Sequence, residues 1–369
     1  MARLVAVALV VVALCGLGVE GGPTPVILVP GIAGSQLEVR LNSSYEAPRW
    51  YCRKGGTGGW THVWFNLEDY VTAECVAKEL HVNVDVVEGD RLRYSNAVGV
   101  EVRPVEGLAG IKCLDPHFCE LTAYFEPLIE FLESQGGYVL GETLFGAPYD
   151  FRMAGDGLTQ LGYEEKLTRL IEEIVQKQQR RVTLVAHSMG GMVVTYFLAG
   201  KTKTWCDSHV ETVVTVSSPY GGSFLALQGS VSGDPIGLPF YHDAFLGVQA
   251  NSPSGPWLFP ASGLFNPEEP AVVTKGKNYT ATAESYAELL SDLGRSEQLK
   301  ALRGVRSLRG IMFDHEGGPK YPEFSGQMNH ICFIGGGRPT PLQFTYDDVD
   351  SFSPGMDPPA PKYTKSIWR

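Results

Sequence analysis

One serine, set between small residues where two apolar runs meet, constrains the fold of this chain more than any other feature. The segment 186–190 has the sequence AHSMG; it follows the apolar residues 182–185 and precedes the apolar residues 191–198. The first run has the length of a buried strand and the second the length of a buried helix. Small residues two positions on either side of Ser188 let strand and helix approach closely around a strained serine backbone. The pattern predicts a strand, a sharp turn that exposes the serine hydroxyl, and a helix.

A strand, turn and helix of this kind form the nucleophile elbow of α/β-hydrolases. In an elbow the Ser188 hydroxyl is the catalytic nucleophile, and the Met189 backbone N–H is left to bind an oxyanion. A chance match in a loop is the alternative, but the flanking strand and helix favour the elbow. Further strands are predicted at 26–29, 138–145, 210–216 and 331–334, with helices around 121–132 and 167–174. Because strands alternate with helices, we expect an α/β-hydrolase fold with a mostly parallel sheet.

The chain divides into a leader and one domain. Residues 1–22 are predicted to be a secretory signal peptide, because Arg3 precedes an apolar run that is short for a membrane span. An uncleaved membrane anchor is the alternative. Residues 23–369 are expected to form one hydrolase domain, since neither a repeat nor a low-complexity linker interrupts them. The segments 50–90 and 221–270 lack a regular pattern and are expected to be cap insertions.

Charge and residue spacing exclude several classes of function. The formal net charge is -11 and there is no basic tract, so we expect no nucleic-acid partner, and contact with a lipid surface must be mainly apolar. Neither a His-x-x-x-His pair nor a Cys and His cluster with metal-binding spacing occurs. No glycine-rich phosphate loop follows a strand in the required form. We therefore expect neither a metal nor a cofactor.

Cysteines and glycosylation sequons indicate the compartment. Six of the seven cysteines follow residue 22, and in an oxidising compartment some of them should pair. Asn42 and Asn278 each begin an N-glycosylation sequon. Together with the leader, these features predict the secretory pathway, ending in the extracellular space or in a lysosomal or vacuolar lumen.

Several segments, taken in order, resemble the lecithin:cholesterol acyltransferase family, which includes the lysosomal-type phospholipase A2 and plant members. The matching segments are 29–38, 146–152, 186–191, 218–222, 256–260 and 335–341. The resemblance implies a lipid O-acyltransferase or phospholipase acting on glycerophospholipids. Ser188 would take the acyl group, and water, a sterol or another lipid alcohol would accept it. An ordinary soluble esterase is the nearest rival.

The resemblance also implies the parts that surround the nucleophile. The backbone N–H groups of Ile32 and Met189 would form the oxyanion hole. The stretch 230–250 matches the family's active-site lid. Ile32 lies on the loop after the first strand, where this geometry requires the second donor.

A membrane-binding loop is implied at about 50–76. Cys52 and Cys75 match the cysteines that staple this loop in the family. Three aromatic residues lie between them: Trp60, Trp64 and Phe65. They would meet a peripheral lipid surface, or, as the alternative, they are buried in the core of the cap.

The last part of the chain departs from the family pattern. A serine nucleophile needs a base, and the base needs an orienting acid, in the chain order serine, acid, histidine. The family places both after the segment that matches 335–341, and the sequence reaches Arg369 without a match to either. Residues 362–369 show no pattern. Two expectations follow: a truncated active enzyme whose last strands are missing, or a catalytically inactive homologue that binds lipid without turnover.

The remaining histidines and acids are expected to be structural. His209 and His330 precede strands, at the wrong end of a sheet for a base, while the His187 side chain is expected to point away from the tight turn and to pack. His242 lies in the lid and His315 in an irregular glycine-rich stretch, and the acidic cluster Asp347, Asp348 and Asp350 is expected to be a solvated loop. The family partner of Cys332 has no match within the sequence.

Overall fold

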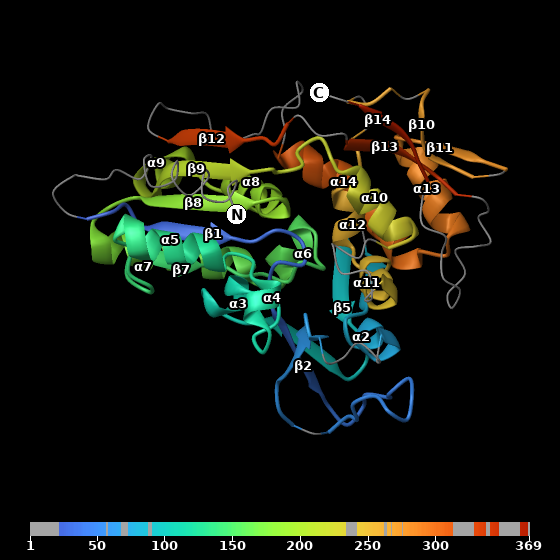
Figure 1. Ribbon diagram of the computed structural model, residues 1–369, viewed down its shortest axis with the longest axis horizontal. Coiled ribbons are helices and arrows are strands. Elements are labelled where there is room, and N and C mark those ends of the chain that lie inside the picture. Colours follow the sequence, from blue (N-terminus) through green and yellow to red (C-terminus); the bar gives the residue numbers. More distant parts are fainter. Residues whose placement is uncertain are drawn as a thin grey trace.

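Figure 1 shows the chain as a computed structural model. The structure describes residues 22–56, 58–67, 73–87, 91–233, 242–261, 264–266, 268–274, 276–312, 328–336, 340–346 and 362–367. Several predictions therefore lie outside the described residues: the signal peptide up to residue 21, residues 234–241 of the lid, His315, Asp347, Asp348 and Asp350.

A sheet of five parallel strands in the order β12-β9-β8-β1-β7 forms the centre of the molecule (Figure 1). The strands are β1 (Val26–Val29), β7 (Leu144–Gly146), β8 (Val182–His187), β9 (Val210–Val216) and β12 (Asn329–Phe333). The parallel sheet confirms the predicted α/β class, and it needs crossover connections that place helices on its faces.

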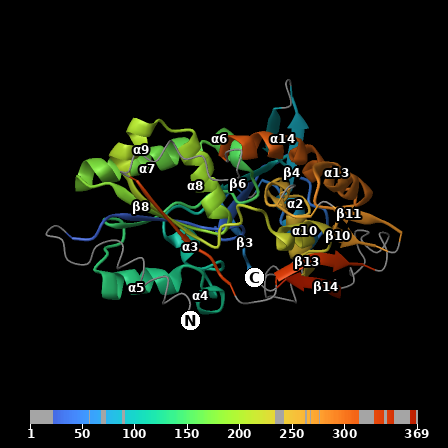
Figure 2. The same ribbon diagram turned by 90° about the horizontal axis from the view of Figure 1, so that it is seen from above.

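Helices cover both faces of this sheet (Figure 2). One face carries α6 (Gly155–Gln160), α7 (Tyr163–Gln178), α8 (Met189–Ala199) and α9 (Lys203–His209). The other face carries α3 (Ala109–Lys112), α4 (Cys119–Thr122) and α5 (Glu126–Gly136). The strands must therefore be apolar on both sides, which is why they read as continuous hydrophobic runs.

Strand β1 shows how the two layers of the core are separated. Successive side chains of a strand point to opposite faces. Ile27 accordingly packs in the cluster that contains Leu167 of α7, whereas Leu28 packs in the cluster that contains Leu132 of α5. All four of these side chains are almost completely buried.

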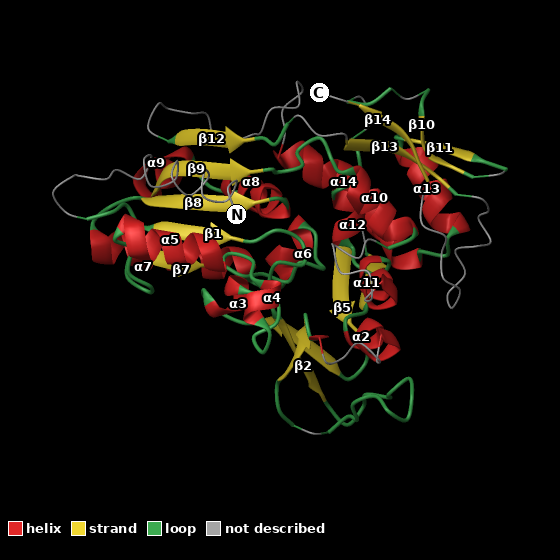
Figure 3. Cartoon of the chain, viewed as in Figure 1, coloured by secondary structure: helices red, strands yellow, loops and turns green. Residues whose placement is uncertain are grey.

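A cap lies beyond the carboxyl ends of the central strands (Figure 3). Its first part comprises β2 (Leu37–Leu41), β3 (Thr61–Trp64), β6 (Val100–Pro104), α2 (Ala73–Glu79), and the antiparallel pair β4 (Val82–Val86) and β5 (Leu92–Asn96). Its second part contains α10 (Phe224–Val231), α11 (His242–Gln249), α12 (Ser254–Trp257), α13 (Ala283–Asp292) and α14 (Ser296–Met312). A four-stranded sheet completes it: β11 (Asn278–Thr280), β10 (Pro270–Val273), β13 (Thr340–Thr345) and β14 (Lys362–Ile367). The two parts touch where α11 packs on α2 and α14 packs on β4.

The structure corrects several predicted elements. The strand predicted at 138–145 is confined to Leu144–Gly146, because Leu144 N–H donates to Val139 O (3.1 Å) and closes a turn with Gly141 at φ 74°. The segment 50–90 is not irregular, since it contains β3, α2 and β4. The tail, which had no recognisable pattern, forms β14 antiparallel to β13. Among the described residues no helix is both long enough and apolar enough to cross a bilayer.

Candidate active site

Ser188 occupies a strained turn between β8 and α8. Its backbone has φ 52° and ψ −124°, a conformation that non-glycine residues rarely adopt. The Ser188 N–H donates to Val216 O of the neighbouring strand β9 (2.8 Å), which fixes the turn at the carboxyl edge of the sheet. The predicted succession of strand, turn and helix is confirmed.

Glycines allow the chain segments around Ser188 to meet. A Cβ atom on Gly190 would lie 2.4 Å from the Pro30 carbonyl oxygen, and one on Gly31 would lie 2.9 Å from Ser188 Cβ. A Cβ atom on Gly191 would lie 1.9 Å from Ser218 Oγ. The turn after β1 is therefore pressed directly against the elbow, an approach that only glycine permits.

Two backbone N–H groups beside Ser188 have no acceptor. Residues 31–34 form a tight turn, closed by the hydrogen bond from the Gly34 N–H to Gly31 O (3.1 Å), with Ala33 at φ 61°. Ile32 lies in the middle of this turn, and its N–H takes no part in the closing bond. Met189 begins α8, so its N–H has no partner within the helix. Among the described residues neither N–H makes a hydrogen bond. Such a pair has the chemistry of an oxyanion hole.

A pocket of about 450 Å³ opens at Ser188. Ile32, His187 and Ser188 line one part of it. Most other lining side chains are apolar: Trp64, Leu114, Phe151, Leu225, Val248 and Leu258. The volume and the lining suit an apolar substrate group such as an acyl chain.

His187 is half-buried beside the nucleophile and is hydrogen-bonded to Tyr124. Its Nδ1 lies 2.6 Å from the Tyr124 hydroxyl, which also accepts the Gly31 N–H (2.9 Å). Burial lowers the pKa of His187 and raises the pKa of Tyr124, so both side chains are neutral at pH 7. His187 was expected to pack, and Tyr124 was read only as one apolar position of a helix. No local signal distinguishes Tyr124, because its partners come from distant segments.

The described histidines do not supply a base for Ser188. His209 stacks on Trp205 and its Nδ1 lies 2.8 Å from that residue's carbonyl oxygen. His330 lies inside β12, not before it, and its Nε2 is 3.1 Å from Thr215 Oγ1. His242 is the first residue of α11, and its side chain lies outside the described part of the structure. Among the described residues the Ser188 hydroxyl has no hydrogen-bond partner, so the structure identifies neither an acid nor a base for it.

The structure decides the position of the loop aromatics. Cys52 and Cys75 form a disulfide (S–S 2.05 Å). Trp64 is 2% exposed and donates its Nε1–H to Ala33 O (3.1 Å), and Phe65 is also buried. These two residues therefore belong to the cap core and do not face solvent, which is the second of the two alternatives. Trp64 instead supports the turn that contains Ile32, through its hydrogen bond to the Ala33 carbonyl oxygen.

Trp60 and Trp50 lie closer to solvent than Trp64. The Trp60 ring is held between Arg103 (4.1 Å to the ring centroid) and Arg40 (4.9 Å), so it is partly covered by charged side chains. Trp50 is 88% exposed and stacks edge-on with Tyr51, itself 45% exposed. Sequence reasoning missed this pair, although it stands immediately before Cys52.

The structure also places the two predicted glycosylation sites and the remaining described cysteines. Asn42 and Asn278 both lie on the surface. A second disulfide joins Cys113 to Cys119. Two of the described cysteines form no disulfide: buried Cys206 and exposed Cys332.

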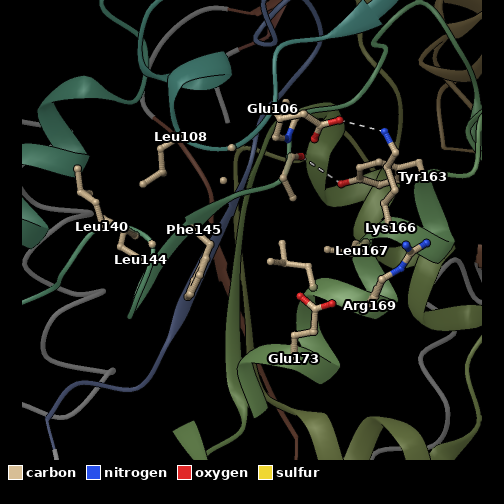
Figure 4. A pocket seen from close by; sticks show the side chains of 16 residues that line it. Glu106, Leu108, Leu140, Leu144, Phe145, Tyr163, Lys166, Leu167, Arg169 and Glu173 are labelled. Carbon is tan, nitrogen blue, oxygen red and sulfur yellow. Dashed lines mark hydrogen bonds and ion pairs between the residues drawn. The ribbon is translucent and has the colours of Figure 1, made fainter. Parts of the chain in front are cut away.

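A second hollow of about 670 Å³ lies between β7 and α7, away from the nucleophile (Figure 4). Leu144 and Phe145 come from the strand side, and Lys166 forms an ion pair with Glu106 across one end (3.0 Å). None of its lining residues is one of the predicted site residues. We assign it no role in the reaction.

The parallel sheet, the strained serine at the end of β8 and the two N–H groups beside it define an α/β-hydrolase. The motifs had predicted a narrower group within this class. The chain belongs to the lecithin:cholesterol acyltransferase family, whose model, "Lecithin:cholesterol acyltransferase", matches residues 60–297. The predicted family is therefore confirmed.

Relatives from animals and a plant agree with this assignment. "Lecithin-cholesterol acyltransferase-like 1" of Arabidopsis thaliana is 32% identical over 74% of this chain and 66% of its own length. "Lysosomal phospholipase A and acyltransferase" of Homo sapiens is 31% identical over 92% of this chain and 77% of its own length. "Phosphatidylcholine-sterol acyltransferase" of Gallus gallus is 29% identical over 92% of this chain and 78% of its own length. By their names, these relatives are acyltransferases and a phospholipase.

Proposed function

We propose that the chain transfers a fatty acyl group from a glycerophospholipid to water or to a lipid alcohol through a covalent intermediate on Ser188. The position of Ser188 carries the proposal: it stands at a strained turn, beside two unused N–H groups, and lines a mainly apolar pocket. The names of the relatives, a lysosomal phospholipase A and acyltransferase among them, support a lipid substrate.

The reaction follows from the geometry of the elbow. The Ser188 hydroxyl attacks the ester carbonyl carbon, and the Ile32 and Met189 N–H groups stabilise the oxyanion that forms. Collapse of this intermediate expels the alcohol of the lysolipid and leaves an acyl ester on Ser188, with the chain in the apolar pocket. An acceptor hydroxyl then attacks the acyl ester. The serine proton must pass to a general base, and the described residues place no base on the Ser188 hydroxyl.

Labelling by a fluorophosphonate tests the nucleophile. The full chain should be labelled and should release fatty acid from phosphatidylcholine vesicles, and Ser188→Ala should lose both activities. Ser208→Ala is the matched control, because this serine lies on α9 and donates only to Thr204 O (2.8 Å). Labelling that persists in Ser188→Ala would refute the assignment.

A catalytically inactive lipid-binding homologue is the second candidate. The observation in its favour is that the Ser188 hydroxyl has no hydrogen-bonded base among the described residues. A wild-type chain that binds vesicles but is neither labelled nor active would establish this alternative. Phospholipid would then be a ligand and not a substrate.

We further propose that the membrane-binding loop at about 50–76 meets the lipid surface through Trp50 and Tyr51, which directly precede the disulfide-bonded Cys52. Tryptophan and tyrosine rings suit the boundary between water and lipid, because each combines an apolar body with a polar group. The Cys52–Cys75 disulfide anchors this exposed pair to α2. The net charge of -11 disfavours attraction to anionic headgroups, so the contact should depend on apolar area.

Partition to neutral phosphatidylcholine vesicles tests the loop. Trp50→Ala should weaken partition about tenfold and leave hydrolysis of a short soluble ester within twofold of wild type. Val139→Ala is the control, since this residue is also exposed (50%) but lies next to the amino end of β7. Equal partition of wild type and Trp50→Ala would exclude this surface.

The disulfides favour an oxidising compartment. We propose passage through the secretory pathway, with glycans on the exposed side chains of Asn42 and Asn278. A loss of mass after enzymatic deglycosylation of the secreted chain, absent in the double variant Asn42→Gln/Asn278→Gln, would support this route. Detection of the unglycosylated chain in the cytosol alone would contradict it.

A further inference from the structure

Tyr124 connects the two segments that would make the active site. It lies between α4 and α5, 93 positions from Gly31 and 63 positions from His187 in the chain. Its hydroxyl oxygen accepts the Gly31 N–H (2.9 Å) and lies 2.6 Å from His187 Nδ1. A Cβ atom on Gly34 would lie only 2.7 Å from Tyr124 Cε1, so the ring is pressed against the same turn. One phenol thus contacts both ends of the turn and the residue before the nucleophile.

The direction of the proton in the short bond follows by elimination. The Tyr124 oxygen already accepts from Gly31, and among the described residues no acceptor other than His187 Nδ1 is available to its O–H. The Tyr124 O–H therefore donates to His187 Nδ1, its one hydrogen-bond acceptor among the described residues. His187 must then be the tautomer that carries its proton on Nε2.

We propose that Tyr124 is a positioning residue for the oxyanion hole: through Gly31 and His187 it sets where the Ile32 N–H lies relative to Ser188. Gly31 directly precedes Ile32, and a Cβ on Gly31 would contact Ser188 Cβ. A displacement of this turn therefore moves a donor that must lie about 3 Å from the developing oxyanion. The inference rests on the proposed acyl-transfer function.

The variant Tyr124→Phe removes the hydroxyl and keeps the ring. The Gly31 N–H then loses its acceptor, and the turn is free to shift. Because a misplacement of about 1 Å can cost a hundredfold in rate, we expect the rate constant of Ser188 phosphonylation to fall between about tenfold and a hundredfold. The half-saturating probe concentration should stay within twofold, since the apolar pocket is unchanged.

Tyr163→Phe is the matched control. Tyr163 is buried and its hydroxyl donates to the Ala147 carbonyl oxygen (3.2 Å), but among the described residues this hydroxyl makes no hydrogen bond to the turn at 31–34 or to the elbow at 187–189. A similar loss of rate in both variants would indicate general destabilisation and overturn the inference.

The acceptor side is tested at His187. In His187→Asn the amide oxygen can replace Nδ1 as acceptor of the Tyr124 proton, whereas His187→Leu offers no acceptor. Asn should therefore retain more of the phosphonylation rate than Leu. Equal rates in these two variants would contradict a role for the hydrogen bond.

A measurement that needs no turnover separates this inference from the proposed function. In ¹⁵N-labelled wild-type protein the His187 signal should be that of the Nε2–H tautomer, and Tyr124→Phe should shift the Ile32 amide resonance while Tyr163→Phe leaves it in place. If the wild type is not labelled by the fluorophosphonate, the proposed function fails, and these resonances still decide the inference. An Nδ1–H tautomer, or an unmoved Ile32 resonance in Tyr124→Phe, would overturn it.

Discussion

Replacement of Arg152 should show how strongly the cap is bound to the hydrolase core. The guanidinium is completely buried and holds Asp150 through two bonds, from Nε (2.8 Å) and from an η nitrogen (2.6 Å). Its remaining donors bind the cap, at Leu80 O (3.0 Å) and Asn96 Oδ1 (2.9 Å). Arg152→Met keeps an apolar stem but removes every one of these bonds.

The expected loss follows from the burial of the partner. Asp150 is 3% exposed, so Arg152→Met leaves a carboxylate without its counter-charge inside the protein. Breaking a buried pair in this way costs about 3–5 kcal/mol of unfolding free energy. Removing the charge as well, in Asp150→Asn/Arg152→Met, should recover more than about 1 kcal/mol of that loss.

Guanidinium denaturation of the disulfide-intact protein measures these differences at constant m-value. Arg93→Met is the control, because its ion pair with Asp85 (3.1 Å) is solvent-exposed and should contribute at most about 1 kcal/mol. If Arg152→Met lost no more than Arg93→Met, or if the double variant were less stable than Arg152→Met, the reasoning about the buried pair would be wrong.

Three further predictions concern the elbow and the loop. Gly190→Ala should destabilise the protein by about 1–3 kcal/mol, because its Cβ would lie 2.4 Å from the Pro30 carbonyl oxygen. Gly200→Ala is the control: its Cβ would have no contact under 3.5 Å, so thermal unfolding should show almost no change. Cys75→Ser opens a loop whose cysteines are 23 residues apart, so it should lower the free energy of unfolding by about 3 kcal/mol. It should also weaken vesicle binding more than hydrolysis of a short soluble ester, and equal losses in the two assays would contradict a lipid-binding loop. Burial lowers the pKa of His187, so below about pH 6.5 the unfolded state binds more protons than the folded state and stability falls as the pH falls. His187→Asn should flatten this slope in denaturation curves measured from pH 7.5 to pH 5, and an unchanged slope would show that His187 does not contribute.

Local patterns were enough to predict the framework of the site. The run that became β8 and the small residues around Ser188 act within a few positions of one another, so they predicted the elbow correctly. Two predicted elements were wrong because a turn, or pairing with a strand distant in the sequence, overrides the local residue pattern. Residues 138–145 are apolar enough for a strand, but Gly141 turns the chain within them. Residues 362–367 show no alternation, yet they pair with β13.

The sequence by itself determined the α/β class, the family and the nucleophile candidate, because these depend on periodicity, on residue size next to Ser188 and on the order of motifs. Only the tertiary structure decided which aromatic residues are exposed: Trp64 binds the turn at Ala33, whereas Trp50 faces solvent. It also brought Tyr124 to Gly31, which lies 93 positions away in the chain. Contacts between such distant segments depend on the order of the strands in the sheet and on how the loops that connect them pack together. No local window of the sequence contains that information.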